Sequence, residues 1–159
     1  MSELANANAQ AVVDRLRAWN SEAVSQVIEY RGETTLVVPH KLLRAIAKQC
    51  KEDPELNFNQ VSDATCVDRF PVEPRFELNY QLLSIPRTQR IRLRTTISGQ
   101  QPVIDSLEPV WPGINWMERE IFDLFGIRFE GHTDLRRILL PDDFEGAPLR
   151  RDYPTEGPR

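Results

Sequence analysis

The sequence predicts a two-layer α+β domain, followed by a short helix and an extended C-terminal segment. The stretches 76–82 and 89–97 alternate strictly between apolar and polar residues, as strands with one buried and one wet face do. Residues 5–19 and 42–50 carry apolar side chains at helical spacing, so helices should cover one face of the sheet. After Gly126, four prolines stand among many apolar residues, which predicts neither a long helix nor a solvated tail.

Composition excludes several classes of function. The chain has 159 residues, a net charge of −4 and a pI near 5.3, which does not suit a nucleic-acid-binding protein. No apolar run approaches the roughly 20 residues that a membrane helix needs. The first residues resemble neither a secretory signal nor a transit peptide, and two cysteines, Cys50 and Cys66, do not make a disulfide scaffold. We therefore expect a reducing cytosolic environment, with membrane association only through a partner.

Periodicity and turn residues predict the elements of the first 110 residues. In chain order they are a helix at 5–19, strands at 24–30 and 34–38, a helix at 39–53, and strands at 59–68, 76–82 and 89–97. Pro39 can start the second helix, and Pro54 should end it. Residues 84–88 should join the last two strands as a hairpin, whereas 103–110 has no clear pattern.

Residues 115–125 should form the next helix, with Asn115 as its N-cap and Gly126 at its end. Its apolar stripe should pack on the domain and consists of Met117, Ile121, Leu124 and Phe125. The residues that lie largely off this stripe are Glu118, Arg119, Glu120 and Asp123. The expected division is an α+β domain over 1–110, a helical region over 111–126, and an extended segment over 127–159 that lies on another molecule.

The carboxylates of this helix raise the question of acid–base catalysis. A general acid/base pair needs two carboxyl groups that face one cleft. Glu118 and Glu120 should point about 200° apart, because each helical residue turns by roughly 100°. Arg119 and Asp123 are four residues apart and can form an ion pair. A charged helix face, or a polar contact with a partner, is therefore the favoured interpretation.

No set of residues has the spacing of a metal site. His132 and Asp134 resemble a ligand pair, and Asp142 and Asp143 could add oxygens, but zinc requires three or four ligands. The other histidine, His40, lies at the start of a helix with a basic wet side, and the cysteines lack a C-x-x-C arrangement. We expect the chain alone to bind no metal ion, flavin or haem.

A basic stripe of Arg90, Arg92 and Arg94 follows one expected strand. Sheets that bind nucleic acid place aromatic residues beside such charges, but Tyr80 falls on the opposite, apolar face. A solvated face paired with Glu77 across the hairpin is the favoured interpretation, and a partner contact is the alternative. Since no Walker-type or G-x-G-x-x-G loop occurs, no nucleotide site is expected.

The C-terminal third carries a specific motif over residues 118–127, 131–132, 134–141 and 149–154. It resembles the C subunit of the proton-translocating NADH:quinone oxidoreductase, that is, the 30 kDa subunit family of respiratory complex I. Residues 61–68 also resemble a strand of that family, which ends in Val-Asp. The signature or interface positions that the resemblance marks are Glu118, Arg119, Glu120, Asp123, Phe125, Gly126, His132, Asp134, Arg136, Arg137, Pro141, Arg150, Arg151, Asp152 and Tyr153. The sequence departs at Thr133, often proline in the family, and at Ala147, often histidine; neither has an obvious chemical role.

The resemblance implies a peripheral-arm scaffold and assembly subunit without a redox centre. FMN, iron–sulfur clusters, NADH and quinone belong to the complex, and no catalytic, cofactor-binding or metal residue is expected in this chain. Its implied partners are the large D subunit, under the segment 127–159, and the neighbouring quinone-module subunits. The implied location is the cytoplasmic face of a bacterial inner membrane, with length and direct start favouring an unfused bacterial version.

Two alternatives remain open. The chain could be the equivalent subunit of a membrane-bound hydrogenase-type complex, which nearby genes for flavin-binding and NADH-binding subunits would exclude. It could also be a free-standing acid/base enzyme that uses Glu118 and Asp123, which turnover by the purified single chain would support.

Overall fold

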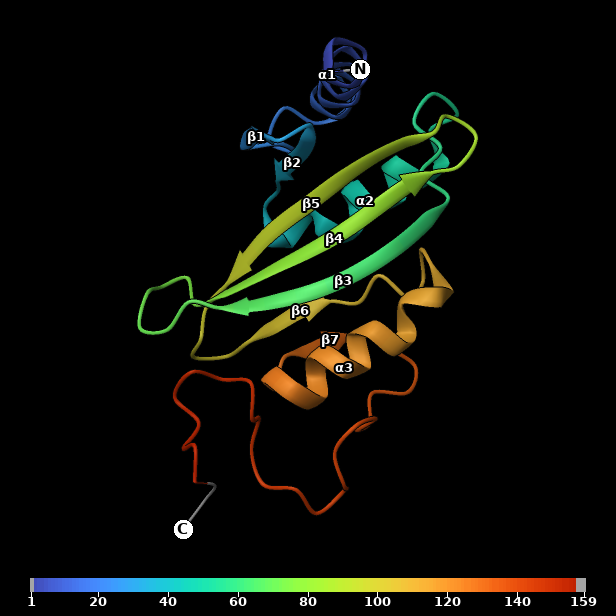
Figure 1. Cartoon of the computed structure of the whole chain (residues 1–159). Helices are drawn as coiled ribbons and strands as arrows, with labels where there is room; N and C mark the ends of the chain where they lie inside the picture. Colours follow the sequence, from blue (N-terminus) through green and yellow to red (C-terminus); the bar gives the residue numbers. More distant parts are fainter. Residues whose placement is uncertain (1, 157–159) are drawn as a thin grey trace.

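A five-stranded mixed sheet, in the order β1-β2-β5-β4-β3, forms the frame of the molecule (Figure 1). The computed structural model describes residues 2–156; Met1 and residues 157–159, the end of the expected C-terminal segment, lie outside the described part. The strands are β1 (Gln26–Tyr30), β2 (Glu33–Val37), β3 (Gln60–Asp68), β4 (Phe76–Ser84) and β5 (Gln89–Ile97). Neighbouring strands are antiparallel except β2 and β5, which run parallel. The predicted α+β class is confirmed.

Helices pack on one face of this sheet and enclose a single hydrophobic core. They are α1 (Ser2–Trp19), the 3-10 turn η1 (His40–Leu42), α2 (Leu43–Glu52), the 3-10 turn η2 (Pro112–Ile114) and α3 (Asn115–Phe125). The covered face carries Phe76, Leu78, Tyr80 and Leu82 of β4, all fully buried as their alternation predicts. None of the described helices is long and apolar enough to cross a membrane.

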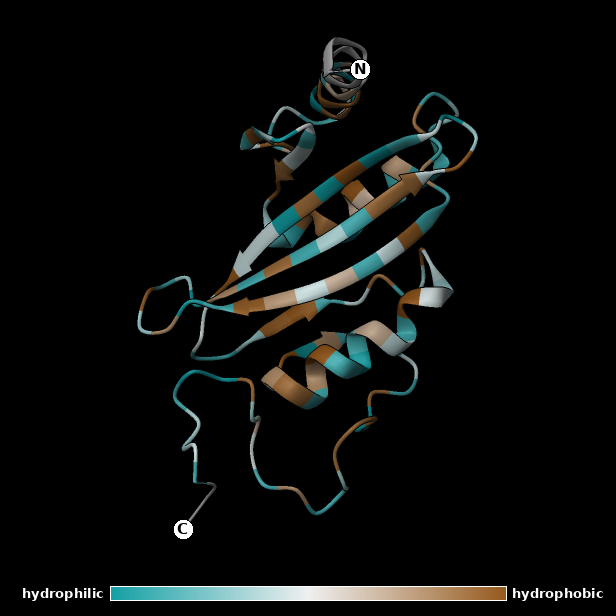
Figure 2. Ribbon diagram, in the orientation of Figure 1, coloured by the Kyte–Doolittle hydropathy of each residue, from teal (hydrophilic) through white to brown (hydrophobic). Residues whose placement is uncertain are grey.

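The polar residues of β4 that alternate with its apolar residues point to the opposite face of the sheet, and Figure 2 shows such alternation of hydropathy along the strands. Glu77 and Asn79 are nevertheless buried there, which corrects the expectation of a solvated face. Arg69 binds the carboxylate of Glu77 at 2.6 Å, and Arg94 contacts both Glu77 and Asn79 at 3.2 Å. Long arginine side chains therefore cover the carboxylate, so the predicted pairing of the basic stripe with Glu77 exists without a solvated face.

A second, two-stranded sheet of β6 (Val103–Asp105) and β7 (Arg128–Glu130) was not predicted. These strands are parallel, and they bury Ile104 and Phe129. Arg44 of α2 donates to Ser106 O at 3.0 Å and to Glu130 O at 2.6 Å. The chain up to Glu130 is thus part of the folded domain, and the extended segment starts at Gly131.

Candidate functional site

The site begins with helix α3, whose predicted bounds are confirmed. The 3-10 turn η2 leads into it from Pro112, and Gly126 ends it in the left-handed conformation, with φ of 70°. The N–H of Gly126 donates to Phe122 O at 2.9 Å. Asn115 does not cap the helix, contrary to prediction, because its side-chain amide donates to Glu108 at 2.9 Å.

The buried side of α3 is charged rather than apolar. Glu118 is 0% exposed, Asp123 1% and Arg119 7%. Of the apolar stripe that periodicity predicts to be buried, only Ile121 is; the half-buried members are Met117, Leu124 and Phe125. Met117 and Phe125 still pack against the hydrophobic core as predicted, whereas Leu124 lines a surface groove beside β3. The β6–β7 region and the C-terminal segment cover the charged side of the helix.

Asp123 holds the backbone of the C-terminal segment. Its Oδ2 accepts the N–H groups of Ile138, Leu139 and Leu140 at 3.1, 2.8 and 2.9 Å, and its Oδ1 lies 2.6 Å from Arg137 Nη1. Burial disfavours the charged carboxylate, but the Leu140 N–H, the Arg137 guanidinium and the other two amides outweigh it and lower the pKa of Asp123 to about 2. Asp123 is thus a charged anchor for the segment.

Two arginines complete this anchor. Arg119 donates to the carbonyl oxygens of Arg136 and Arg137 at 3.2 and 3.0 Å. Arg137 donates in turn to those of Phe144 and Gly146, at 2.8 and 3.3 Å. Arg119 and Asp123 do not form the predicted ion pair, because both side chains bind residues of the C-terminal segment instead.

Glu118 occupies a separate buried position. The Ser106 hydroxyl donates to its Oε2 at 2.5 Å and the Leu107 N–H donates to its Oε1 at 2.7 Å. Burial raises the pKa of Glu118 to about 7, although both hydrogen bonds and Arg44 oppose the shift. Glu120 is exposed, so Glu118 and Glu120 do not face a common cleft, as their helical spacing predicts.

His132 fastens the start of the extended segment to the start of α3. Its side chain is fully buried, with Nε2 3.1 Å from Asn115 O and Nδ1 accepting the Asp134 N–H at 3.0 Å. The Asp134 carboxylate turns away and pairs with Arg136 at 2.9 Å. Glu108 Oε2 lies 3.7 Å from Nδ1. His132 and Asp134 therefore make a local turn, and no cluster of possible metal ligands is found among the side chains that the structure describes.

A second anchor holds the far end of the segment, and its centre, Arg75, was not predicted. This buried guanidinium binds Asp68 at 2.7 Å and Asp152 at 2.5 Å. Asp68 also accepts the Arg151 N–H at 2.8 Å. These interactions tie the segment to the β3–β4 end of the large sheet, 77 residues earlier in the chain. Only the Val-Asp ending of residues 61–68 pointed toward this position.

Between the anchors, further signature residues hold the segment. Arg150 donates to Phe125 O, the last carbonyl of α3, at 2.7 Å. The Tyr153 hydroxyl donates to Glu145 O at 3.2 Å. The structure therefore gathers most of the marked residues around one task, which is to fix residues 131–153 against α3 and the edge of the sheet.

The fold and the site define a protein of the α+β class in which buried charged side chains hold an extended C-terminal segment in place. Residues 36–159 match the family described as the respiratory-chain NADH dehydrogenase 30 kDa subunit. The chain belongs to this family. It is 41% identical over 158 residues to the C subunit of NADH-quinone oxidoreductase from Geotalea uraniireducens (strain Rf4), covering 99% of this chain and 94% of that protein.

Other relatives and solved structures agree. The C subunit of NADH-quinone oxidoreductase from Moorella thermoacetica is 47% identical over 124 residues, covering 77% of this chain and 82% of that protein. A solved trypsin-resistant fragment (1–134) of Nqo5 superposes with a TM-score of 0.67 and 26% identity, covering 80% of this chain and 99% of the fragment. A chain of an archaeal membrane-bound sulfane sulfur reductase has a TM-score of 0.76 over 92% of this chain and 85% of its own, and at 23% identity it shows the fold alone.

Proposed function

We propose that this chain is a non-redox scaffold and assembly subunit in the peripheral arm of a NADH:quinone oxidoreductase. It works at the cytoplasmic face of a bacterial inner membrane, and its C-terminal segment lies on the large D subunit. Electron transfer from NADH to quinone and proton translocation belong to the complex, whose FMN and iron–sulfur clusters are held by other subunits. The names of the relatives and the family membership support the parent complex.

The observation that carries the proposal is the use of the Asp123 carboxylate. This carboxylate accepts three backbone N–H groups and binds an arginine, so its role is to fix the backbone of the C-terminal segment. Its depressed pKa keeps it charged, which does not suit a group that exchanges protons. The segment held in this way turns apolar side chains outward, with Leu139 61% and Leu149 51% exposed. Exposed leucines on a fixed backbone fit burial against a partner.

Co-purification of a tagged chain tests the proposal. The full chain should bring down the large D subunit and its neighbours from detergent-solubilised membranes, whereas a chain ending at Glu130 should fold but recover much less of them. Because the cut follows β7, the buried contacts of the second sheet are retained. Turnover by the isolated chain, or a stoichiometric flavin, haem or iron content, would overturn the scaffold role.

The nature of the parent complex needs its own test. In a NADH-linked complex the tagged chain should co-purify with flavin-binding and NADH-binding subunits, and the recovered assembly should reduce quinone with NADH. Recovery of a hydrogenase-type large subunit without those two would reassign the chain to a related membrane-bound complex. The scaffold role would survive that result, but the electron donor would change.

A further inference from the structure

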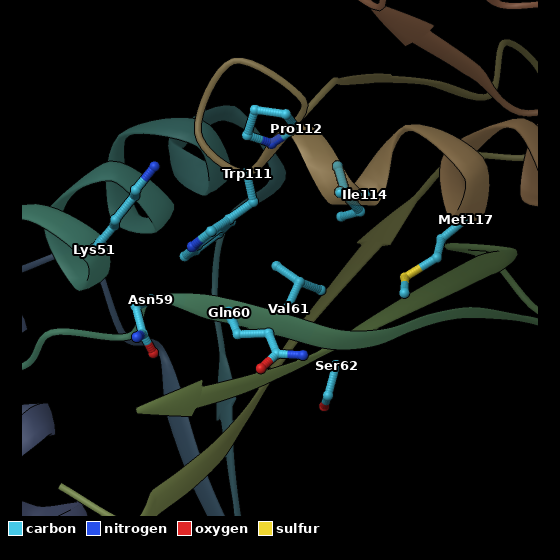
Figure 3. A pocket seen from close by; sticks show the side chains of 10 residues that line it. Lys51, Asn59, Gln60, Val61, Ser62, Trp111, Pro112, Ile114 and Met117 are labelled. Carbon is cyan, nitrogen blue, oxygen red and sulfur yellow. The ribbon is translucent and has the colours of Figure 1, made fainter. Parts of the chain in front are cut away.

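Two grooves follow one another along the seam between strand β3 and helix α3. The first, of about 380 Å³, lies between Gln60–Ser62 and Ile114–Met117 (Figure 3). The second, of about 250 Å³, lies between residues 63–66 and 120–125 and is bordered by Leu149 of the C-terminal segment. Since β3 and α3 run in the same direction here, the two grooves form one elongated surface, called the β3–α3 seam below.

The seam has an apolar floor. In Figure 3, Val61 rises from β3 toward Ile114, with Met117 beside them. Farther along, Leu124 and Phe125 of α3 are only half-buried. Met117, Leu124 and Phe125 of the predicted stripe therefore keep part of their surface open to the seam, whereas Ile121 is in the core. Covering it with a partner would remove apolar surface from water, which favours association.

The strand wall of the seam is an edge. β3 is the last strand of the five-stranded sheet, so within the described part of the chain the backbone groups that face away from β4 have no strand partner. An extended chain can use such groups for pairing. The seven residues from Gln60 to Cys66 span about 20 Å, which suits an extended segment of roughly six residues.

Charges of opposite sign stand at the middle of the seam and at one of its ends. Asp63 on the strand wall and Glu120 on the helix wall are exposed where the two grooves meet, and neither pairs with a described cationic side chain. At the end beside Gln60, Lys51 donates to Val110 O at 2.5 Å, and none of the described carboxylates pairs with it. The seam therefore has an unpaired acidic middle and an unpaired basic end.

We propose that the β3–α3 seam docks an extended segment of another subunit. That segment carries lysine or arginine at its middle, facing Asp63 and Glu120, a carboxylate at the Lys51 end, and apolar side chains over the apolar floor of the two grooves. The inference rests on the proposed role as a subunit of a larger complex, and it adds a docking site distinct from the outward face of the C-terminal segment. Charge complementarity also fixes the direction in which the partner segment lies.

Charge reversal in the assembled complex tests the acidic middle of the seam. Asp63→Lys with Glu120→Lys should lower the amount of assembled complex by about tenfold, because like charges would face the partner. The matched control is Glu22→Lys with Glu29→Lys, which makes the same charge change on exposed residues away from the seam and should assemble normally. Urea denaturation of each isolated variant checks that the chain still folds. Equal assembly of both double variants would overturn the proposal.

Photo-cross-linking identifies the occupant without changing the shape of the seam. Met1 and Met117 are the two methionines of the chain, and Met117 lines the first groove. The chain is produced with photo-methionine in place of methionine and reconstituted into the complex. It should then cross-link through position 117 to a partner segment that carries the stated charges. Reversing that segment's basic residue to glutamate should then restore assembly of Asp63→Lys with Glu120→Lys.

Cross-linking to a second copy, to this chain's own tail or to an uncharged segment would overturn the docking proposal. Each of these results would leave co-purification of the wild-type chain with its partners intact. The scaffold role itself fails only if the wild-type chain recovers no other subunit, so the two failures are distinguishable.

Discussion

Helices α2 and α3 have similar lengths and pack on the same face of the sheet, yet their buried sides differ in chemistry. The buried residues of α2 are Leu43, Ile46, Ala47 and Cys50, and those of α3 are Glu118, Arg119, Ile121 and Asp123. Apolar burial is non-directional, so α2 can be held by any well-packed neighbour. Buried charges need matched partners in fixed geometry, so α3 holds one particular segment in one particular position.

The largest effect should separate the two helices by apolar truncation. Ile46→Ala on α2 removes a fully buried side chain and should cost about 2–5 kcal/mol of unfolding free energy. Leu124→Ala on α3 removes a half-buried side chain that faces the β3–α3 seam, and should cost only about 1–2 kcal/mol. Urea denaturation of the isolated chains measures both values.

The surface control for this pair is Lys48→Ala. Lys48 is exposed and forms only a long ion pair of 3.9 Å with Glu52, so its loss should change stability by less than about 0.5 kcal/mol. If Leu124→Ala proves as costly as Ile46→Ala, Leu124 belongs to the core after all, and the contrast between the helices is broken.

The next effect concerns the pH dependence that only α3 should show. Burial raises the pKa of Glu118 to about 7, above its ordinary value of 4.5. Between these two pH values the folded state therefore binds a proton that the unfolded state has lost. This stabilisation is fully present below pH 4.5 and is lost as pH rises through about 7. Glu118→Gln keeps the shape and should be more stable than wild type at pH 8 by roughly 1–3 kcal/mol.

Thermal or urea unfolding at pH 5 and pH 8 checks this prediction. The difference between wild type and Glu118→Gln isolates this group from the other carboxylates, because those are present in both chains. Near pH 5 the two chains should be close in stability. A difference that does not change with pH would mean that Glu118 is ionised at both values and that its burial is fully compensated.

The contrast between the helices also explains what a sequence can reveal. Strand alternation and the α2 stripe predict the sheet and its covered face, because apolar burial leaves a periodic signal. The short β6 and β7 strands leave none, since three residues are too few for a period. Arg75 was missed for another reason: its partner Asp152 lies 77 residues away, and a contact at that separation has no local pattern.

The contacts of the marked residues could not be read from local spacing. The family resemblance marks Asp123, Arg137 and Asp152, and the structure gives each a partner in the tail or the sheet. Local spacing instead suggested an ion pair of Arg119 with Asp123. A helical i, i+4 rule sees only the helix, whereas three amides and Arg137 of the segment compete better for the carboxylate.

A smaller and more local effect should follow from weakening the Asp123 anchor. Asp123→Asn keeps one acceptor oxygen but loses the charge, so the amides of residues 138–140 should exchange faster, by about 1–2 kcal/mol of opening free energy. The amides of β4 should be unchanged. In wild type the same protection should fall as pH drops from about 4 toward 2, because a depressed pKa stabilises only while the group is ionised.

Hydrogen exchange of the isolated chain measures this local opening. Asp142→Asn provides the control, since that carboxylate is exposed and lies in the same segment. Unchanged protection of residues 138–140 in Asp123→Asn would show that the segment is held by its other contacts, and the charged side of α3 would lose its assigned role.

The smallest effect on folding should come from Glu120, the one carboxylate of α3 that the fold leaves exposed. Glu120→Gln should change the stability of the isolated chain by less than about 0.5 kcal/mol, because no described group pairs with it. In the complex it should lower assembly modestly, since one of two acidic groups at the middle of the seam is lost, while turnover per assembled complex stays near normal. A proton-transfer role would give the reverse, with normal assembly and turnover lowered on the order of 100-fold. Assembled amount and turnover measured in the same membranes separate these outcomes, and collapsed turnover in fully assembled complexes would end the scaffold interpretation of α3.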